Sequence, residues 1–147
     1  MNEHIKEQLE LLNHQVKELT GIYHQAAVKS GVSDNEFWVW YTLLILGEEH
    51  SQQDICDMWS LPKQTVNSVV ANLNKKGYVF LEVVPGTRNR KVIRLTDAGK
   101  AYGKDIVTQI YEAENRTIER LSEEERQSCI ALLGRYIGFL REEFSSL

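Results

Sequence analysis

The sequence predicts a mainly α-helical chain with one β-hairpin, in the element order ααααββαα. Apolar residues recur at the three- and four-residue spacing of amphipathic helices at both ends of the chain. Later in the chain, two short runs rich in β-branched residues flank the dipeptide Pro85-Gly86, as in a hairpin. The 147 residues include only two prolines and nine glycines, and no linker is evident. We therefore expect a single domain over residues 1–147.

The first and last helices carry heptad stripes, which predict long helices over about residues 2–29 and 122–145. Ser122 and Glu125 form the S-x-x-E pattern of a capping box at the start of the last helix. A lone chain would leave much of both stripes exposed, so we expect them to pair across the two-fold axis of a homodimer. The alternative is that the two helices pack on each other within one chain. The stripe residues are Ile5, Leu9, Leu12, Val16, Leu19, Ile130, Leu133, Ile137, Leu140 and Phe144.

The next elements follow from start signals and apolar content. Gly31, with Ser33 or Asp34, ends the first helix and starts a second one. Residues 35–46 are apolar almost all round, so this second helix is expected to be buried at the centre. Ser51 then caps a short third helix over "SQQDICDMW", with Asp54 in the capping-box position.

A fourth helix over "PKQTVNSVVANLNKK" starts with a proline, whose missing N–H has no partner in a first turn. The strands "YVFLEVV" and "KVIRL" follow, and Thr96 caps a long helix that runs to about Glu119. Two short helices joined by the tight turn "SLP" and followed by a hairpin predict a winged helix-turn-helix over about residues 35–95.

In such an arrangement the second short helix enters the major groove of DNA, where the edges of the bases can be distinguished. Its outward face has hydrogen-bonding side chains and one lysine, and no acidic residue lies between Ser60 and Leu81. Solvated helix faces ordinarily mix both charges, so this pattern favours DNA recognition over a plain polar surface. The expected DNA-binding residues of this helix are Lys63, Gln64, Thr65, Asn67, Ser68 and Asn72.

The charge distribution favours the same function. The formal net charge is -4, but residues 60–95 have seven basic residues and one acidic residue. A basic region of this kind can attract a polyanion even when the whole chain is acidic, although a chance cluster of solvated side chains is the alternative. We expect Ser51 and Gln52 to hold a phosphate at the N-terminus of the third helix. Roughly four to six phosphates per half-site would make binding strongly dependent on salt.

The combination resembles the MarR-type winged-helix transcriptional regulators, over essentially the whole chain. The resemblance is carried by "SQQDICDMWSLPKQTVNSVVANLNKKGYV" and by "RLTDAGK", which is similar to the family's L-T-x-x-G-K. It implies a transcriptional regulator, usually a repressor, that binds double-stranded DNA as a homodimer and is released by a small-molecule effector. The two-fold axis predicts an inverted repeat as the operator, with recognition helices about 34 Å apart.

The resemblance also implies that an arginine of the wing, the β-hairpin with its turn, enters the adjacent minor groove, which narrows in A·T-rich DNA. We expect this role for Arg88 or Arg90, with Lys91 and Arg94 nearer the phosphates. Wings of the family usually carry a D-x-R pattern, and this chain has Thr87 and Asn89 at the two positions. Without that pattern, the internal salt bridge of the wing is in doubt.

Effectors of the family are small phenolic or other aromatic molecules, which bind between the dimer helices and the winged domain. The resemblance therefore points to the aromatic cluster of the second helix and the end of the first. We expect Tyr23, Trp38 and Tyr41 to line the effector site, with Phe37 and Trp40 close by. The alternative is that these rings are ordinary core residues.

Other function classes find less support. The chain has no P-loop, no G-x-G-x-x-G after a strand and no G-x-S-x-G, so we expect neither an enzyme nor a bound cofactor. A winged helix that binds another protein is the main alternative, but such a partner would not require both the basic region and an acid-free helix face. We expect a cytoplasmic protein, because the N-terminus has no signal peptide and the longest apolar stretch is too short to span a membrane.

Metal- and redox-responsive regulators are two further alternatives within the family. His4, His14, His24 and His50 lack the spacing of metal ligands, so no metal site is expected within one chain, although a site shared across a dimer stays open. The two cysteines favour structural roles over a redox switch, because neither lies in the first helix. They are Cys56 and Cys129.

Overall fold

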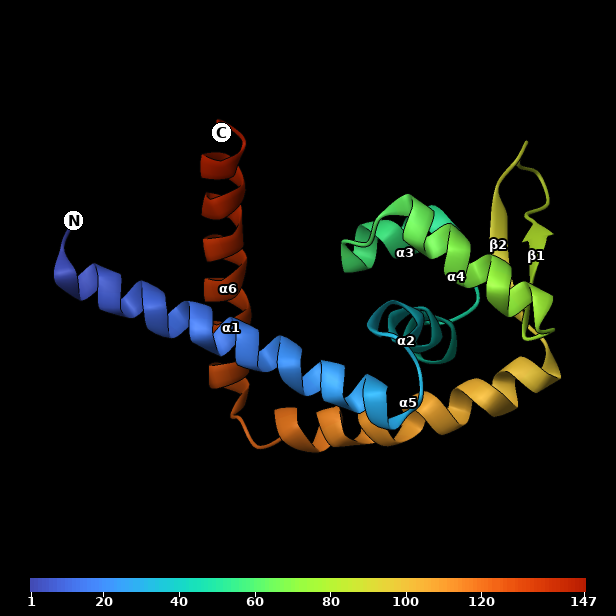
Figure 1. Cartoon of the computed structure of the whole chain (residues 1–147), viewed down its shortest axis with the longest axis horizontal. Coiled ribbons are helices and arrows are strands. Elements are labelled where there is room, and N and C mark those ends of the chain that lie inside the picture. Colours follow the sequence, from blue (N-terminus) through green and yellow to red (C-terminus); the bar gives the residue numbers. More distant parts are fainter. The chain divides into compact units, whose positions relative to one another are not determined.

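The computed structural model describes all residues, 1–147, and its helices and single hairpin follow the predicted order (Figure 1). The predicted fold class, mainly α-helical with one β-hairpin, is confirmed. The chain divides into two compact units, Met1–Ile110 and Tyr111–Leu147, and each is described by itself. None of the helices combines the length and the apolar character that crossing a membrane would require.

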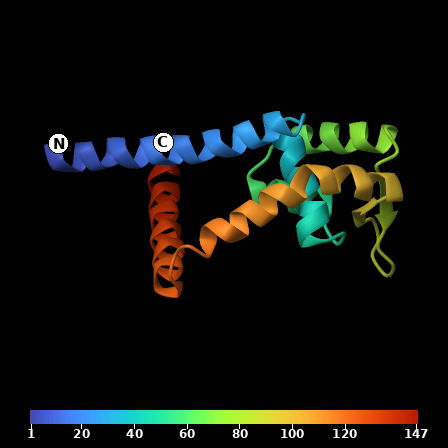
Figure 2. The ribbon, with the colours of Figure 1, turned by 90° about the horizontal axis from the view of Figure 1, so that it is seen from below.

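The first unit opens with α1 (Glu3–Lys29), whose N-terminus is capped by the Asn2 side chain, which accepts a hydrogen bond from the His4 N–H at 2.9 Å. Ala27 is the only buried residue of this helix. Figures 1 and 2 both show the N-terminal half of α1 extending away from the other elements of residues 1–110. The apolar stripe of α1 is therefore left without a partner inside this unit.

The central helix α2 (Asp34–Tyr41) starts at Ser33, whose hydroxyl accepts a hydrogen bond from the Glu36 N–H. Trp40 is fully buried, and the predicted central position of the helix is confirmed. The predicted helix does not stay regular to its end, however. It continues as a π-helical turn, η1 (Thr42–Leu46), which stops at Gly47 with a positive φ of 114°. Glycine adopts this φ without the steric cost that a side chain would add.

The helix-turn-helix consists of α3 (Gln52–Trp59) and α4 (Lys63–Lys75). The predicted capping box of α3 is present, with Ser51 and Asp54 each bonding the other's backbone N–H. Ser60 makes the turn in a left-handed conformation, and Pro62 lies at the N-cap position of α4. The inward side of α4 packs into the core through Val66, Val70 and Leu73, which are at most 2% exposed.

The hairpin pairs β1 (Val79–Val83) with β2 (Lys91–Leu95) in antiparallel register, Val79 opposite Leu95 and Val83 opposite Lys91. The other edge of β2 is covered by the segment before α3, since the Ile93 N–H donates to the His50 carbonyl at 3.0 Å. Covering this edge leaves fewer unpaired backbone groups and joins the hairpin to the start of the helix-turn-helix.

The helix α5 (Asp97–Ile118) starts against the backbone that joins α4 to β1. The Thr96 hydroxyl donates to the Gly77 carbonyl at 2.6 Å and accepts from the Gly99 N–H at 3.0 Å. A Cβ atom on Gly99 would lie 1.9 Å from the carbonyl oxygen of Tyr78. The L-T-x-x-G pattern thus encodes a cap and a close backbone approach, which only glycine permits.

The core of the first unit closes around the aromatic side chains of α2. Thr42 is its one fully buried polar residue, and both of its hydrogen bonds are satisfied. The Thr42 hydroxyl donates to the Trp38 carbonyl at 2.7 Å and accepts from the Trp59 indole N–H at 2.6 Å. This bond joins the end of α3 to the central helix, so the helix-turn-helix is anchored to the core on its inner side.

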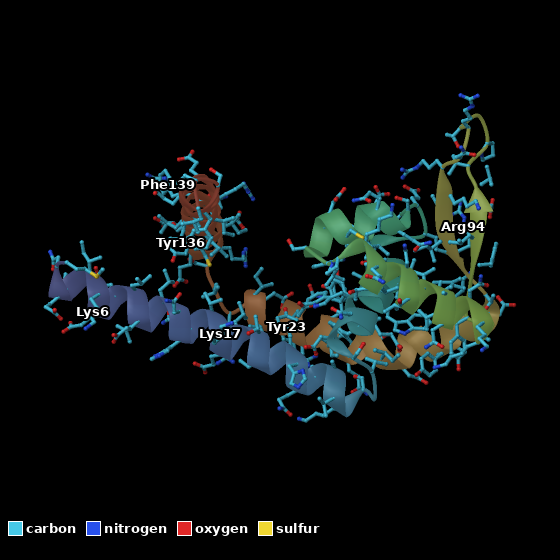
Figure 3. All side chains as sticks on the ribbon, turned by 45° about the horizontal axis from the view of Figure 1, so that its top comes forward. Lys6, Lys17, Tyr23, Arg94, Tyr136 and Phe139 are labelled. Atoms are coloured by element: carbon cyan, nitrogen blue, oxygen red, sulfur yellow. The ribbon has the colours of Figure 1, made fainter.

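The second unit contains the end of α5 from Tyr111 and the last helix, α6 (Glu123–Phe144). The predicted capping box between Ser122 and Glu125 is confirmed. No residue of α6 is buried, and Figure 3 shows its side chains extending on every side, Tyr136 and Phe139 among them. Apolar side chains of the predicted stripe are among these exposed residues, so this face of the helix is not covered within its own unit.

Candidate nucleic-acid interface

The outward face of α4 is polar because the helix turns Val66, Val70 and Leu73 toward the core. Five of its six predicted DNA-binding side chains are exposed, and Thr65 is half-buried. None of these side chains is acidic. The face can therefore donate and accept hydrogen bonds along a groove of DNA without repelling the phosphates on either side. The five exposed residues are Lys63, Gln64, Asn67, Ser68 and Asn72.

An open hollow of about 450 Å³ lies where the N-terminus of α3, the first turns of α4 and the start of β2 come together. It has three basic residues and no acidic residue in its lining. Six of the lining residues are among those expected from the sequence, while Gln53 and Asn89 are not. Both are polar neighbours of predicted residues, which is the signal that could have identified them. The lining residues are Ser51, Gln52, Gln53, Lys63, Asn67, Asn89, Arg90 and Lys91.

The start of α3 presents backbone donors to this hollow. Within the capping box, the Asp54 N–H bonds the Ser51 hydroxyl at 3.1 Å and the Ser51 N–H bonds the Asp54 carboxylate at 2.9 Å. The backbone N–H groups of Gln52 and Gln53, at the first two helical positions, have no partner in the protein. Free N–H groups at the positive end of a helix dipole can bind an anion.

The turn of the wing is closed by Thr87, one of the two residues that replace the family's D-x-R pattern. Both its N–H and its hydroxyl donate to the Val84 carbonyl, at 3.2 and 2.7 Å. Gly86 supplies the positive φ, 80°, that the turn requires. These local hydrogen bonds close the turn, and no salt bridge forms within it.

The basic residues of the hairpin differ in their surroundings. Arg88 is exposed near the tip of the turn and has no partner in the protein. Arg90 donates to the Asp54 carboxylate of α3 at 2.8 Å, and Lys91 is exposed at the start of β2. Arg94, labelled in Figure 3, donates to the Glu48 carbonyl at 2.7 Å and lies 3.4 Å from the Glu82 carboxylate. Arg88 and Lys91 thus present charges without a protein partner.

The carboxyl group of Asp54 stays ionised to a lower pH than an ordinary aspartate. The hydrogen bond from the Ser51 N–H is the largest cause that lowers its pKa, and the hydrogen bond from Arg90 lowers the pKa further. Partial burial acts in the opposite direction but does not prevail. The ion pair with Arg90 therefore stays intact across the neutral range.

A second hollow, of about 340 Å³, lies between α1 and the start of α2. Tyr23 and Trp38 line it, as expected for the effector site, whereas Tyr41 is not among its lining residues. The ring centroids of Trp38 and Tyr41 are 5.4 Å apart, and Trp40 belongs to the closed core. The full lining is Leu19, Thr20, Tyr23, Asp34, Phe37 and Trp38.

The two cysteines differ in burial, and one histidine, His24, is held by a carboxylate. Cys56 is buried in the core, whereas Cys129 is exposed on α6. His24 bonds the Asp34 carboxylate through Nδ1 at 2.9 Å, beside the hollow between α1 and α2.

A family model and solved structures both show similarity to MarR family proteins. A family model described as MarR family matches residues 30–88, which include α2, the helix-turn-helix and the first part of the wing. A search by sequence among curated proteins gives no significant match. Similar solved structures include a MarR family regulator from Neisseria meningitidis, with 25% identity over 99% of both chains and a TM-score of 0.83.

Two further structures share the fold. A MarR/EmrR family transcriptional regulator from Acinetobacter sp. ADP1 has 21% identity over the whole of both chains, with a TM-score of 0.69. MepR from Staphylococcus aureus, solved in a complex with DNA, has 22% identity over 88% of this chain and 94% of its own, with a TM-score of 0.67. The likeness therefore extends beyond the winged domain to both long terminal helices.

Proposed function

We propose that the chain is a winged helix-turn-helix regulator of the MarR type, which binds double-stranded DNA sequence-specifically as a repressor. The hollow at the meeting point of α3, α4 and the wing is the observation that carries the proposal. Its basic lining and the free N–H groups of α3 suit the phosphate backbone. The neighbouring face of α4 suits the edges of the bases.

Each predicted residue has a role in this proposal. Gln64, Asn67 and Asn72 offer amides that can bind adenine bidentately, and Thr65 and Ser68 offer hydroxyls. Lys63 and Lys91 neutralise phosphates beside the hollow, together with the N-terminus of α3 at Ser51 and Gln52. Arg94 lies at the base of the hairpin, where Glu48 and Glu82 already hold its guanidinium. A phosphate contact by this residue would have to share those bonds.

We also propose that the protein binds as a homodimer through its terminal helices. Ile130 on α6 is 69% exposed and Ile5 on α1 is 57% exposed, although both belong to heptad stripes that suit helix pairing. Burying such apolar faces against a second copy stabilises the dimer by the hydrophobic effect. A two-fold axis would then present two recognition helices about one turn of DNA apart, to an A·T-rich inverted repeat.

A mobility shift with DNA from upstream of the chain's own gene tests this function. We expect the wild type to shift the duplex at low salt, with two chains per duplex when the complex is analysed by sedimentation. Simultaneous replacement of Lys63, Gln64 and Arg88 by alanine should weaken binding by about 100-fold or more, because each side chain contributes about 1 kcal/mol or more to the free energy of binding of the dimer.

A matched triple variant of exposed residues outside the interface, with alanine at Lys29, Gln109 and Arg120, should bind like the wild type. No shift by the wild type at low salt would reject DNA binding and favour a winged helix that binds a protein. A complex with one chain per duplex would reject the dimer.

The hollow between α1 and α2 supports an effector site for a small aromatic molecule. Tyr23, Phe37 and Trp38 offer stacking surfaces, and the Asp34 carboxylate at the rim can accept a hydrogen bond from a phenol. We expect phenolic ligands to change tryptophan fluorescence and to release the DNA, and Trp38→Ala should abolish both effects. A fluorescence change that persists in Trp38→Ala would place the ligand elsewhere, and phenols without effect on the wild type would reject the site.

A further inference from the structure

The two arginines near the tip of the wing have opposite surroundings. Arg88 is exposed and has no protein partner. The guanidinium of Arg90 instead reaches back to the first turn of α3, with Nη2 2.8 Å from Asp54 Oδ2 and 3.4 Å from the Glu49 carbonyl oxygen. In the free protein, only Arg88 is therefore available to a ligand without breaking an existing ion pair.

The backbone of Arg90 also holds the wing. Its carbonyl accepts the Val84 N–H at 2.8 Å, a bond that lies between the end of β1 and the tip of the turn. The same residue thus joins the two arms of the hairpin through its backbone and joins the hairpin to α3 through its side chain. Because Asp54 is itself held by the Ser51 N–H at 2.9 Å, the pair connects the wing to a fixed point of the capping box.

Asp54 is in an unusual place for an acidic residue. It lies in the first turn of α3, next to Ser51, Gln52 and Gln53, which line the hollow proposed for the DNA backbone. A bare carboxylate at this point would repel a phosphate, since both carry negative charge. The guanidinium of Arg90 neutralises the carboxylate and leaves the free N–H groups of the helix as the dominant local field.

We propose that Arg90 is a positioning residue, which holds the wing on α3 and masks the charge of Asp54, and that Arg88 is the arginine that enters the minor groove. This inference rests on the proposed DNA binding, and it assigns two roles that the order of residues in the wing leaves open. The ion pair also provides the wing with an anchor where the chain lacks the D-x-R pattern.

A set of single and double variants tests the assignment on the duplex that the wild type shifts. Arg90→Ala should weaken binding about tenfold, because it exposes the Asp54 charge in both half-sites of a dimer. In an Asp54→Asn background, Arg90→Ala should weaken DNA binding by less than about threefold, because residue 54 then has no negative charge for Arg90 to mask. Asparagine can still accept the Ser51 N–H, so the helix cap is kept.

Asp57→Asn is the matched control, since Asp57 lies on the same helix one turn further on and pairs with Gln53 rather than with an arginine. In an Asp57→Asn background, Arg90→Ala should weaken DNA binding as much as it does in the wild type. An equal loss from Arg90→Ala with and without Asp54 would mean that Arg90 contacts DNA directly, and the assignment would be wrong.

The role of Arg88 is tested by changing the base pairs that lie under the wing. Replacing the A·T pairs under the wing by G·C places an amino group in the minor groove and should weaken the wild type. Arg88→Ala should bind about tenfold more weakly and should no longer distinguish the two duplexes. If the Arg88→Ala variant still binds the A·T duplex more tightly than the G·C duplex, Arg88 does not enter the minor groove.

Hydrogen exchange of the free protein separates this inference from the proposed function, because it requires no DNA. The amide of Val84 should exchange faster in Arg90→Ala and in Asp54→Asn, since each substitution releases the wing from α3, and it should be unchanged in Arg88→Ala. If the wild type fails to bind DNA but this pattern is found, only the DNA-binding proposal fails. If Arg90→Ala leaves the exchange of Val84 unchanged, the anchoring role is wrong.

Discussion

Replacement of Gly99 by alanine is expected to lower the stability of the protein by about 3 kcal/mol or more. The new methyl carbon would lie 1.9 Å from the carbonyl oxygen of Tyr78 and 2.8 Å from its carbonyl carbon. These are backbone atoms, so the clash cannot be relieved by rotating a side chain. Either α5 or the strand β1 must move, and such a movement breaks the bonds of Thr96 to the Gly77 and Tyr78 carbonyls.

Thermal unfolding followed by circular dichroism measures this effect, and a fall in the midpoint of about 10 °C is expected. Gly21→Ala is the matched control, because Gly21 lies inside α1 and a Cβ atom there would meet nothing within 4 Å. That substitution should leave stability unchanged or raise it by up to about 1 kcal/mol, the usual effect of replacing glycine in a helix. Equal midpoints for Gly99→Ala and the wild type would show that the close approach does not exist.

Salt should weaken DNA binding by about four to six orders of magnitude between 50 and 200 mM, since a dimer would engage roughly eight to twelve phosphates. The basic residues around the hollow and the free N–H groups of α3 are expected to engage several phosphates in each half-site. Every neutralised phosphate releases condensed counterions, so the logarithm of affinity falls by about 0.9 per contact for each logarithmic unit of salt. Fluorescence anisotropy across a series of salt concentrations gives this slope directly.

Lys63→Ala should make the slope shallower by about two in a dimer, because one phosphate contact is lost in each half-site. Lys104→Ala is the control, since Lys104 is exposed on α5 and does not line the hollow. Its slope should equal that of the wild type. An almost flat response of the wild type to salt would contradict the assignment of the basic region to DNA.

Much of the fold can be predicted from residues that are only a few positions apart in the sequence. The starts of α3 and α6 were predicted from Ser51 and Ser122, because a capping box involves residues only three positions apart. The inward side of α4 follows the three- and four-residue spacing of Val66, Val70 and Leu73. The π-helical turn that starts at Thr42 was not predicted, because the apolar content of residues 35–46 does not distinguish an α-helix from a π-helical turn.

Some features of the candidate site can likewise be predicted from the sequence, whereas others depend on how the elements pack. The composition of α4 indicated a polar face free of acidic residues, and the structure places that face outward. The hollow beside it also includes Gln53 and Asn89, whose inclusion depends on how α3 and the wing meet. Tyr41 was expected at the effector site from the family resemblance, and in the structure its ring lies outside the lining of the second hollow. Spacing along one helix does not reveal which side a neighbouring helix covers.

The order of the elements, the helix caps, the basic region and the family resemblance can all be predicted from the sequence, because each depends on residue types or on neighbours a few positions apart. Which arginine of the wing is free depends instead on contacts between elements that are distant in the sequence. Arg90 meets Asp54 across 36 positions of sequence, and a charge pair over that distance exists only once β2 and α3 are brought together. The same packing leaves Arg88 exposed, so the difference between the two arginines is a property of the fold.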